Sequence, residues 1–311
     1  MTGFGYNISG FGGFANRNPT ITRAVFGGGA NTVNVIDFIT IQTAGNASDF
    51  GDLTVGRHGM AGLASYTRGV FLGGHNGSAA VNTMDYVTIA SAGNASDFGD
   101  VSETKRYMGG LSDRSRGLVG GGINNSGTEL NTIEYITIET TGNVTDFGDL
   151  SVTRHSAAPV ADSTRGVWMG GSDNSFLNTM DYVTIQTTGN ASDFGDLGIA
   201  RRDVMAAGCA DSTRGVVAGG TTGSAGNGIN SIEYITIQST GNGTDFGDLT
   251  VASMTVAAAA DSTRGVFSNG YKASEYINVI SYITIQSTGN ASDFGDATVT
   301  TGYRAGFSGA A

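Results

Sequence analysis

The chain has 311 residues, of which 51 are glycine and only two are proline, and its net charge at pH 7 is −11. Val, Ile and Thr are abundant, so the glycines indicate turns in a strand-rich protein rather than a disordered Gly/Pro-rich chain. The 16 Lys and Arg residues form no cluster that could neutralise phosphates, so we expect no nucleic-acid partner.

The N-terminal segment, residues 1–21, is rich in Gly and Phe and fits no strand of the repeat that follows it. It also lacks the basic and apolar regions of a secretion signal. No apolar run approaches the ~18 residues that span a bilayer. We therefore predict an N-terminal arm (1–21), a propeller domain (22–311), no signal peptide and no membrane insertion, hence a soluble protein.

The tetrapeptide Asp-Phe-Gly-Asp occurs six times at intervals of 47–52 residues, starting at Asp49, Asp97, Asp146, Asp193, Asp245 and Asp293. Such a period is typical of propeller blades, at ~40–50 residues, and too long for ankyrin or TPR units. We predict an all-β, six-bladed β-propeller with repeats that end near residues 55, 103, 152, 199, 251 and 299.

One repeat shows the four strands expected in each blade. Residues 155–161 and 165–169 predict two strands around a polar turn, and 178–185 predict a third strand that is rich in β-branched residues. A short fourth strand is expected around Phe194. No window has the apolar spacing of a helix, so we expect essentially no helix.

Several residue types recur at one position of the repeat. An Arg opens the second strand in all six copies and an acidic residue stands in the third strand of five, so we expect these two to pair across the strands. Aromatic residues 12 positions apart, such as Tyr135 and Phe147, are expected to pack between blades. The lone Cys209 is interpreted as a small buried residue.

The two chain ends complement each other. The last repeat is followed by one more first strand, 302–309, whereas the first repeat begins with its second strand at Arg23. We predict that the C-terminal strand completes the first blade and closes the ring, which removes an open sheet edge.

The order of a first strand, a Gly-Gly doublet such as Gly170-Gly171, an Asn-x-apolar-acid-Tyr segment and a later aromatic resembles the kelch repeat of β-propellers. Two departures are Asn269-Gly270 in the last doublet and Phe in place of the kelch Trp. The run from Tyr282 to Asp296 resembles repeats in virion proteins of marine tailed phages, especially cyanophages. This second resemblance implies a virion protein, and we expect it on the exterior of the particle.

Candidate chemistry is sparse, and we expect no enzyme, no catalytic residue and no cofactor. His58 and His155 occupy the same position in two repeats and are expected at one mouth of the ring. Asp pairs that flank Phe-Gly could bind Ca²⁺, at Asp49 and Asp52 or at Asp193 and Asp196. The favoured interpretation is that these carboxylates cap a turn and bind backbone amides, so that no metal is bound.

Loops after the Gly-Gly doublets differ between repeats, and variable loops on a rigid scaffold commonly bind partners. The candidate binding residues in them are His75, Asn76, Asn124, Asn125, Asp173, Phe176, Tyr271 and Tyr276.

We therefore expect a non-enzymatic structural or binding module of a phage virion, attached to the tail or capsid. Its expected partners are other virion proteins and possible host-surface glycans. A glycan-binding lectin is the alternative, and a hydrolase with its site at the mouth of the ring is the weakest one.

Overall fold

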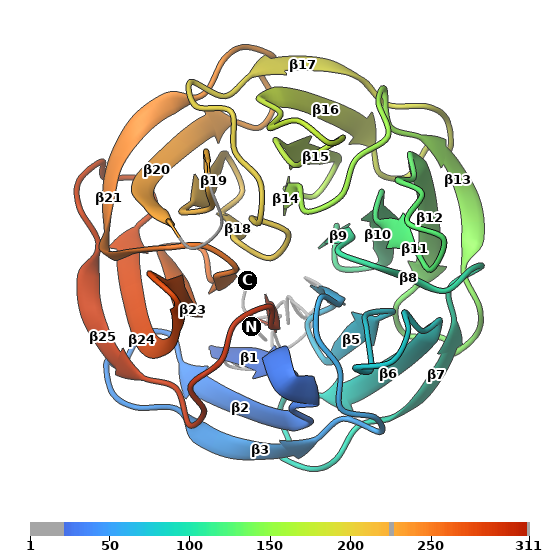
Figure 1. Cartoon of the computed structure of the whole chain (residues 1–311), viewed down its shortest axis with the longest axis horizontal. Helices are drawn as coiled ribbons and strands as arrows, with labels where there is room; N and C mark the ends of the chain where they lie inside the picture. Colours follow the sequence, from blue (N-terminus) through green and yellow to red (C-terminus); the bar gives the residue numbers. More distant parts are fainter. Residues whose placement is uncertain (1–21, 224–226, 310–311) are drawn as a thin grey trace, which may run out of the picture.

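Six four-stranded antiparallel sheets stand around a central axis in the computed structural model, as Figure 1 shows in a view along that axis. The structure describes residues 22–223 and 227–309, so the predicted arm, residues 1–21, lies outside the described part. Within that part the only helical turn is a 3₁₀ segment, η1 (Ala30–Thr32). The predicted all-β, six-bladed propeller is confirmed.

Each blade runs from an inner strand at the axis to an outer strand at the rim (Figure 1). Blades 1 to 3 consist of β26 (Ala305–Ser308), β1 (Arg23–Gly27), β2 (Val35–Thr40) and β3 (Ser48–Asp52); of β4 (Ala61–Ala64), β5 (Arg68–Leu72), β6 (Thr83–Thr88) and β7 (Ser96–Asp100); and of β9 (Gly109–Ser112), β10 (Arg116–Gly120), β12 (Thr132–Thr137) and β13 (Thr145–Asp149). Blades 4 to 6 consist of β14 (Ala158–Ala161), β15 (Arg165–Met169), β16 (Thr179–Thr184) and β17 (Ser192–Asp196); of β18 (Gly208–Ala210), β19 (Arg214–Ala218), β20 (Ile229–Thr236) and β21 (Thr244–Ser253); and of β22 (Ala257–Ala260), β23 (Arg264–Lys272), β24 (Glu275–Thr284) and β25 (Ser292–Asp296). A small extra ribbon pairs β8 (Lys105–Arg106) with β11 (Ile123–Asn124).

The C-terminal strand closes the ring as predicted. β26 pairs antiparallel with β1, from Ala24 opposite Ser308 to Gly27 opposite Ala305. The strand is shorter than the expected 302–309, because residues 302–304 turn around the axis before it begins.

Apolar side chains fill the spaces between neighbouring blades. In one such cluster Phe50 of blade 1 is buried together with Val87 and Ile89 of blade 2, and Phe38 packs against them. Phe38 meets Phe50 edge-to-face at 5.9 Å, and the five other blades repeat this pair at 6.0–6.2 Å. The expected packing of these aromatics between blades is confirmed.

The predicted pairing of the second-strand arginines with third-strand carboxylates is wrong. Arg165 instead lies 4.3 Å above the ring of Tyr182 and donates to the carbonyl of Ile237 in the next blade, at 3.1 Å. All six blades have this arrangement, with ring distances of 4.1–4.4 Å. Arg165 pairs with Thr184 and Asp181 with Trp168, so the arginine and the carboxylate lie on opposite faces of the sheet and cannot meet. The ring of Tyr182 lies on the same face as Arg165 and stacks with it.

The third-strand carboxylates pair with basic residues that come just before the inner strand. In blade 2 Arg57 and Asp85 are both fully buried and lie 2.7 Å apart. Blades 3, 4 and 5 have equivalent buried pairs, Lys105–Glu134, Arg154–Asp181 and Arg201–Glu233. In blade 1 the partner of Asp37 is Arg304, which stands three positions further along its repeat. In blade 6 two serines replace the charges, and Ser281 bonds to Thr250 at 2.5 Å.

The Asp-Phe-Gly-Asp segments are outer strands with a bulge, so the expectation that their aspartates cap a turn is wrong. Each outer strand is contacted by the next blade, through the turn that follows that blade's third strand. Gly93 and Ala95 donate to the carbonyls of Phe50 and Asp52 at 2.7 and 2.8 Å, and Asn94 Oδ1 accepts from the Asp52 amide at 3.0 Å. We call this contact the clasp. It recurs between all six pairs of neighbouring blades and covers each outer edge.

Candidate functional site

The ring has two different ends. We call the end with the turns between first and second strands, such as 162–164, the turn end. The opposite end, with the loops that follow the Gly-Gly doublets, is the loop end. Thr22 and Gly309 flank the paired strands β1 and β26 at the turn end, so both ends of the described chain lie there.

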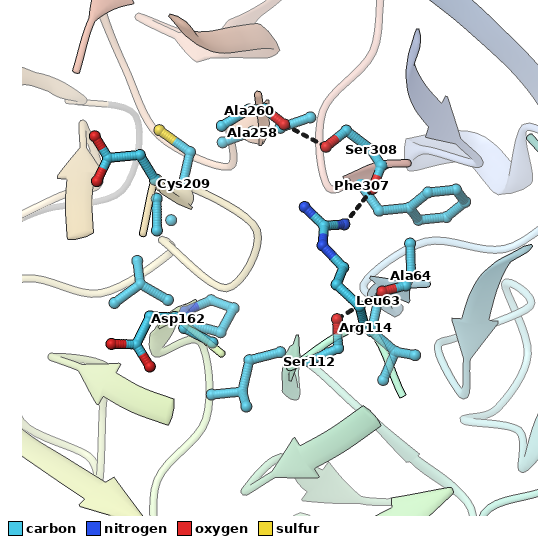
Figure 2. Close-up of a pocket in the computed structure, with 18 of the residues that line it drawn as sticks. Leu63, Ala64, Ser112, Arg114, Asp162, Cys209, Ala258, Ala260, Phe307 and Ser308 are labelled. Atoms are coloured by element: carbon cyan, nitrogen blue, oxygen red, sulfur yellow. Dashed lines mark hydrogen bonds between the residues drawn. The ribbon is translucent and has the colours of Figure 1, made fainter. Parts of the chain in front are cut away.

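The turn end opens into an axial channel of about 370 Å³ lined by the inner strands and their turns (Figure 2). Its carboxylates are already bonded. Asp162 Oδ1 accepts from the amides of Thr164 and Arg165, at 2.7 and 2.8 Å, and Oδ2 accepts from Gln238 of the next blade at 2.5 Å. Asp113, Asp211 and Asp261 have the same bonds.

Arg114 extends into this channel and donates to the Ser308 carbonyl at 2.6 Å (Figure 2). It stands where three other repeats have Ser, and its guanidinium lies 5.6 Å from the ring of Tyr66, which is 54% exposed. On the channel wall Cys209 is buried, and burial raises the pKa of its thiol. The interpretation of this cysteine as a small buried residue is confirmed.

At the loop end, one residue from each repeat surrounds the axis in the left-handed conformation, with φ of 59–66°. We call these six residues the axial ring: Gly59, Tyr107, Ser156, Asp203, Thr255 and Tyr303. Left-handed backbone is unfavourable for every member except glycine. The surrounding structure therefore holds these residues in a strained conformation.

Backbone hydrogen bonds join the axial ring. Tyr107 donates to the carbonyl of Gly59 at 2.7 Å, Gly59 to that of Tyr303 at 2.9 Å, and Tyr303 to that of Thr255 at 3.2 Å. The Thr255 amide donates to the carbonyl of Asp203 at 2.9 Å. The ring is completed by the Val204 amide, which donates to the carbonyl of Ser156 at 3.2 Å, and by the Ser156 amide, which donates to that of Tyr107 at 2.7 Å. These bonds compensate for the strained backbone and fix the side chains at the axis.

The side chains of the axial ring fall into two halves. Tyr107 and Tyr303 lie on either side of Gly59, and their ring centroids are 5.7 Å apart. A Cβ at Gly59 would come within 2.6 Å of the Tyr107 ring, so glycine is what allows that ring to lie there. The other half is polar and consists of Ser156, Asp203 and Thr255.

The histidines surround the aromatic half. Measured between ring centroids, His58 lies 6.0 Å from Tyr303, 6.4 Å from Tyr107 and 5.2 Å from His75. His155 lies 6.1 Å from Tyr107. The expectation that His58 and His155 lie together at one mouth of the ring agrees with this geometry. Burial is the main cause that lowers the pKa of each to about 4, and nearby charges add to it. Both imidazoles are therefore neutral at pH 7.

Burial also sets the protonation of the remaining groups in the axial ring. It raises the pKa of Asp203, although the guanidinium of Arg202, 3.7 Å away, opposes the shift. It raises the pKa of the phenols of Tyr107 and Tyr303, and the carboxylate of Asp203 adds to that effect. The phenols remain protonated hydrogen-bond donors at neutral pH.

The predicted binding-loop residues all lie at the loop end, but they do not form one group. The loop amides and carboxylate hold their own loops: Asn76 and Asn124 accept from amides two to four residues ahead, Asp173 accepts from Ser175, and Asn125 bonds to both backbone groups of Ala80 in the neighbouring loop. Phe176 lies under Arg202 at 5.1 Å.

Three of the predicted residues approach the axial ring. His75 contacts His58, and Tyr276 comes within 3.2 Å of the position that a Cβ on Gly302 would occupy, next to Tyr303. Tyr271 meets Tyr276 edge-to-face at 5.0 Å. The clustering of His75, Tyr271 and Tyr276 near the axis follows from the short strand pairings that join each loop to the segment before the next inner strand.

The candidate calcium residues lie elsewhere, on the outer strands. Asp49 and Asp52 belong to β3, and Asp193 and Asp196 belong to β17. Across residues 22–223 and 227–309, no three His, Cys, Asp or Glu side chains gather in a way that could hold a metal ion.

The axial ring itself was not anticipated as a unit. Its signal in the sequence is the position that follows His58, occupied in the six repeats by Gly, Tyr, Ser, Asp, Thr and Tyr. Five of the six are polar or aromatic residues, whereas the adjacent positions are mostly basic or apolar, and Gly59 is the one indication of a left-handed backbone.

No protein-family model and no curated protein matches this chain. In the described part of the chain, no helix is long and apolar enough to cross a membrane.

Proposed function

We propose that this propeller is a non-enzymatic recognition module that binds a partner through its loop end. The observation that carries the proposal is where the unrepeated residues lie. Charged residues at repeated positions belong to the scaffold, in the buried ion pairs, the stacked arginines, the turns and the outer strands. All three histidines, and four of the five described tyrosines outside the repeated Tyr position, lie at the loop end.

Recognition needs an asymmetric surface, and a six-fold scaffold provides one only where its copies differ. Tyr66 and Arg114 interrupt the repetition at the turn end, but Arg114 donates to the Ser308 carbonyl and lies beside Tyr66. The loop end, by contrast, combines differing loops with the axial ring. It is the better candidate for the binding surface.

We further propose that the module belongs to the exterior of a phage particle. The kelch-like order of the repeat supports a binding propeller, and the phage-like run from Tyr282 to Asp296 supports a tail or capsid-associated protein. Because Thr22 lies at the turn end, attachment through residues 1–21 to another virion protein would leave the loop end facing outward.

Immunogold electron microscopy of the phage particles tests both location and orientation. Antibodies against the hairpin tip at residues 271–276 should label intact particles. Antibodies against the turn at 161–165 should label only disrupted particles, since the attached face is covered. Particles that bind neither antibody, intact or disrupted, would refute the virion proposal, and labelling of intact particles by the turn-end antibody alone would reverse the orientation.

A further inference from the structure

The loop end contains polar atoms that the protein leaves without partners. Eleven buried side-chain atoms of the described chain have no hydrogen-bond partner, and five of them belong to the buried ion pairs. The other six occupy only two positions of the repeat, both beside the axis at the loop end: His58 Nδ1, Arg106 Nε, His155 Nδ1 and Arg202 Nε at one, and Ser156 Oγ and Thr255 Oγ1 at the other.

Such a concentration needs an explanation, because buried polar groups in folded proteins are nearly always bonded. Ser156 and Thr255 are only 1% and 2% exposed, and their hydroxyls flank Asp203 in the axial ring. His155 lies 3.2 Å from Glu129, which accounts for one of the six atoms. Arg202 Nε likewise lies 3.7 Å from Asp203, which accounts for a second. The other four atoms, His58 Nδ1, Arg106 Nε and the hydroxyls of Ser156 and Thr255, lie beside the axis but are buried, so a ligand there could engage them only after their side chains rotate.

The two halves of the axial ring define the shape of that ligand. Tyr107 and Tyr303 supply aromatic faces, and Ser156, Asp203 and Thr255 supply hydroxyls and a carboxylate across the axis from them. A ligand that matches both halves has an apolar face and a rim of hydroxyl groups. A pyranose ring has this form, since its C–H groups lie against aromatic faces while its hydroxyls bond to polar side chains.

The charges around the axial ring favour an uncharged ligand. Two basic residues, Arg106 and Arg202, and two acidic residues, Asp203 and Glu129, lie around it, so neither sign of charge is in excess. A phosphate or a nucleic acid would need unbalanced positive charge, and a metal ion would need a cluster of ligands that this end does not offer in its described residues.

We infer that the axial ring is a binding site for a neutral saccharide, with a pyranose ring placed against Tyr107 and Tyr303 and its hydroxyls bonded by Ser156, Asp203 and Thr255. This inference rests on the proposed function of the loop end and names the chemical class of its partner. It assigns recognition to the propeller axis rather than to the variable loops alone.

The test uses the full chain and a panel of methyl pyranosides: the α- and β-anomers of methyl glucoside, galactoside and mannoside, with glucuronate and sialic acid as charged probes. Saturation-transfer NMR should detect binding of at least one neutral glycoside. Tyr107→Gly and Tyr303→Gly should each abolish that signal. Glycine is already present at the equivalent position in Gly59, so these changes remove a ring and also relieve the left-handed backbone.

Tyr66→Ala is the matched control, since it removes an exposed tyrosine from the opposite end and should leave the signal unchanged. Wild-type protein labelled with 3-fluorotyrosine gives a second measurement that needs no folded variant. Addition of the glycoside should shift the resonances of Tyr107 and Tyr303 and not that of Tyr66.

Three results would overturn the inference: no transfer from any neutral glycoside, transfer that survives in both glycine variants, or transfer from the charged probes alone. The antibody experiment on intact particles distinguishes this failure from failure of the proposed function. Outward labelling of the hairpin tip without glycoside binding would reject the saccharide and keep the recognition surface.

Discussion

The buried Arg57–Asp85 pair allows the stabilisation from the ion pairs to be measured against an alternative present in the same chain. Asp85→Ser removes the carboxylate that lies 2.7 Å from a fully buried guanidinium. Breaking a buried pair by removing one partner costs about 3–5 kcal/mol, because the remaining charge is left uncompensated. Burial already lowers the pKa of Arg57, and Asp85 is the group that opposes this shift.

The double change R57S/D85S copies blade 6, where Ser253 and Ser281 stand at the two positions. Thr54 stands where Thr250 bonds to Ser281 in blade 6, so the same hydroxyl pair can form. The Gly73 carbonyl, which accepts from Arg57 Nε at 2.8 Å, loses that donor. We expect a net loss of about 1–3 kcal/mol, the usual effect of an unmade buried hydrogen bond.

Calorimetry measures the comparison directly. For a chain of this size 1 kcal/mol corresponds to about 1.5 °C in Tm, so D85S should melt about 5–8 °C below wild type and R57S/D85S about 2–5 °C below it. The double variant is therefore expected to be more stable than the single one. If R57S/D85S melts below D85S, the two charges do not compensate each other and the argument for the ion pairs is wrong.

Three further perturbations test the ring, the clasp and the loop end. Acidification from pH 6.5 to 4 should lower Tm by several degrees, because His58 and His155 have pKa values of about 4 in the folded protein and bind protons more readily when unfolded. Calorimetry at a series of pH values measures this change, which should be smaller in the H58N/H155N variant. Gly99→Ala should lower the free energy of unfolding by more than about 2 kcal/mol in urea melts, since the new Cβ would lie 2.5 Å from the backbone of the neighbouring turn. Gly93→Ala should be nearly neutral, because no atom lies within 4 Å of the position its Cβ would occupy. Equal effects of the two substitutions would contradict the clasp. Deletion of residues 302–309 should cause aggregation in light scattering by exposing the edge of β1, whereas a monomeric, cooperatively melting product would show that the ring closes otherwise.

The fold was predictable because the signals that encode it are local and repeated. The spacing of Asp-Phe-Gly-Asp gave the number of blades, and the surplus strand after the last repeat gave the closure. The side-chain partners were not predictable, since they depend on the distance between blades. Arg165 and Asp181 stand on neighbouring strands but on opposite faces of the sheet. Arg165 therefore stacks on Tyr182, and Arg154, eleven residues earlier, pairs with the carboxylate.

The candidate site was predictable only in part, for a related reason. Loop variation correctly directed attention to His75, Tyr271 and Tyr276 at one end of the ring. Tyr107 and Tyr303 escaped notice because neither residue type signals a left-handed backbone, and their contact exists only once the ring is closed. Residues gathered at an axis come from distant repeats, and no local pattern links them.

The clasp gives every blade two complementary surfaces, a turn on one side and an outer strand on the other. Contacts of this kind are heterologous, and they close because each step rotates the next unit by about one sixth of a circle. The covalent links between blades are then dispensable in principle. A fragment that holds two complete repeats would assemble with two others into a three-subunit ring, and the symmetry of such an assembly would be set by the blade interface alone.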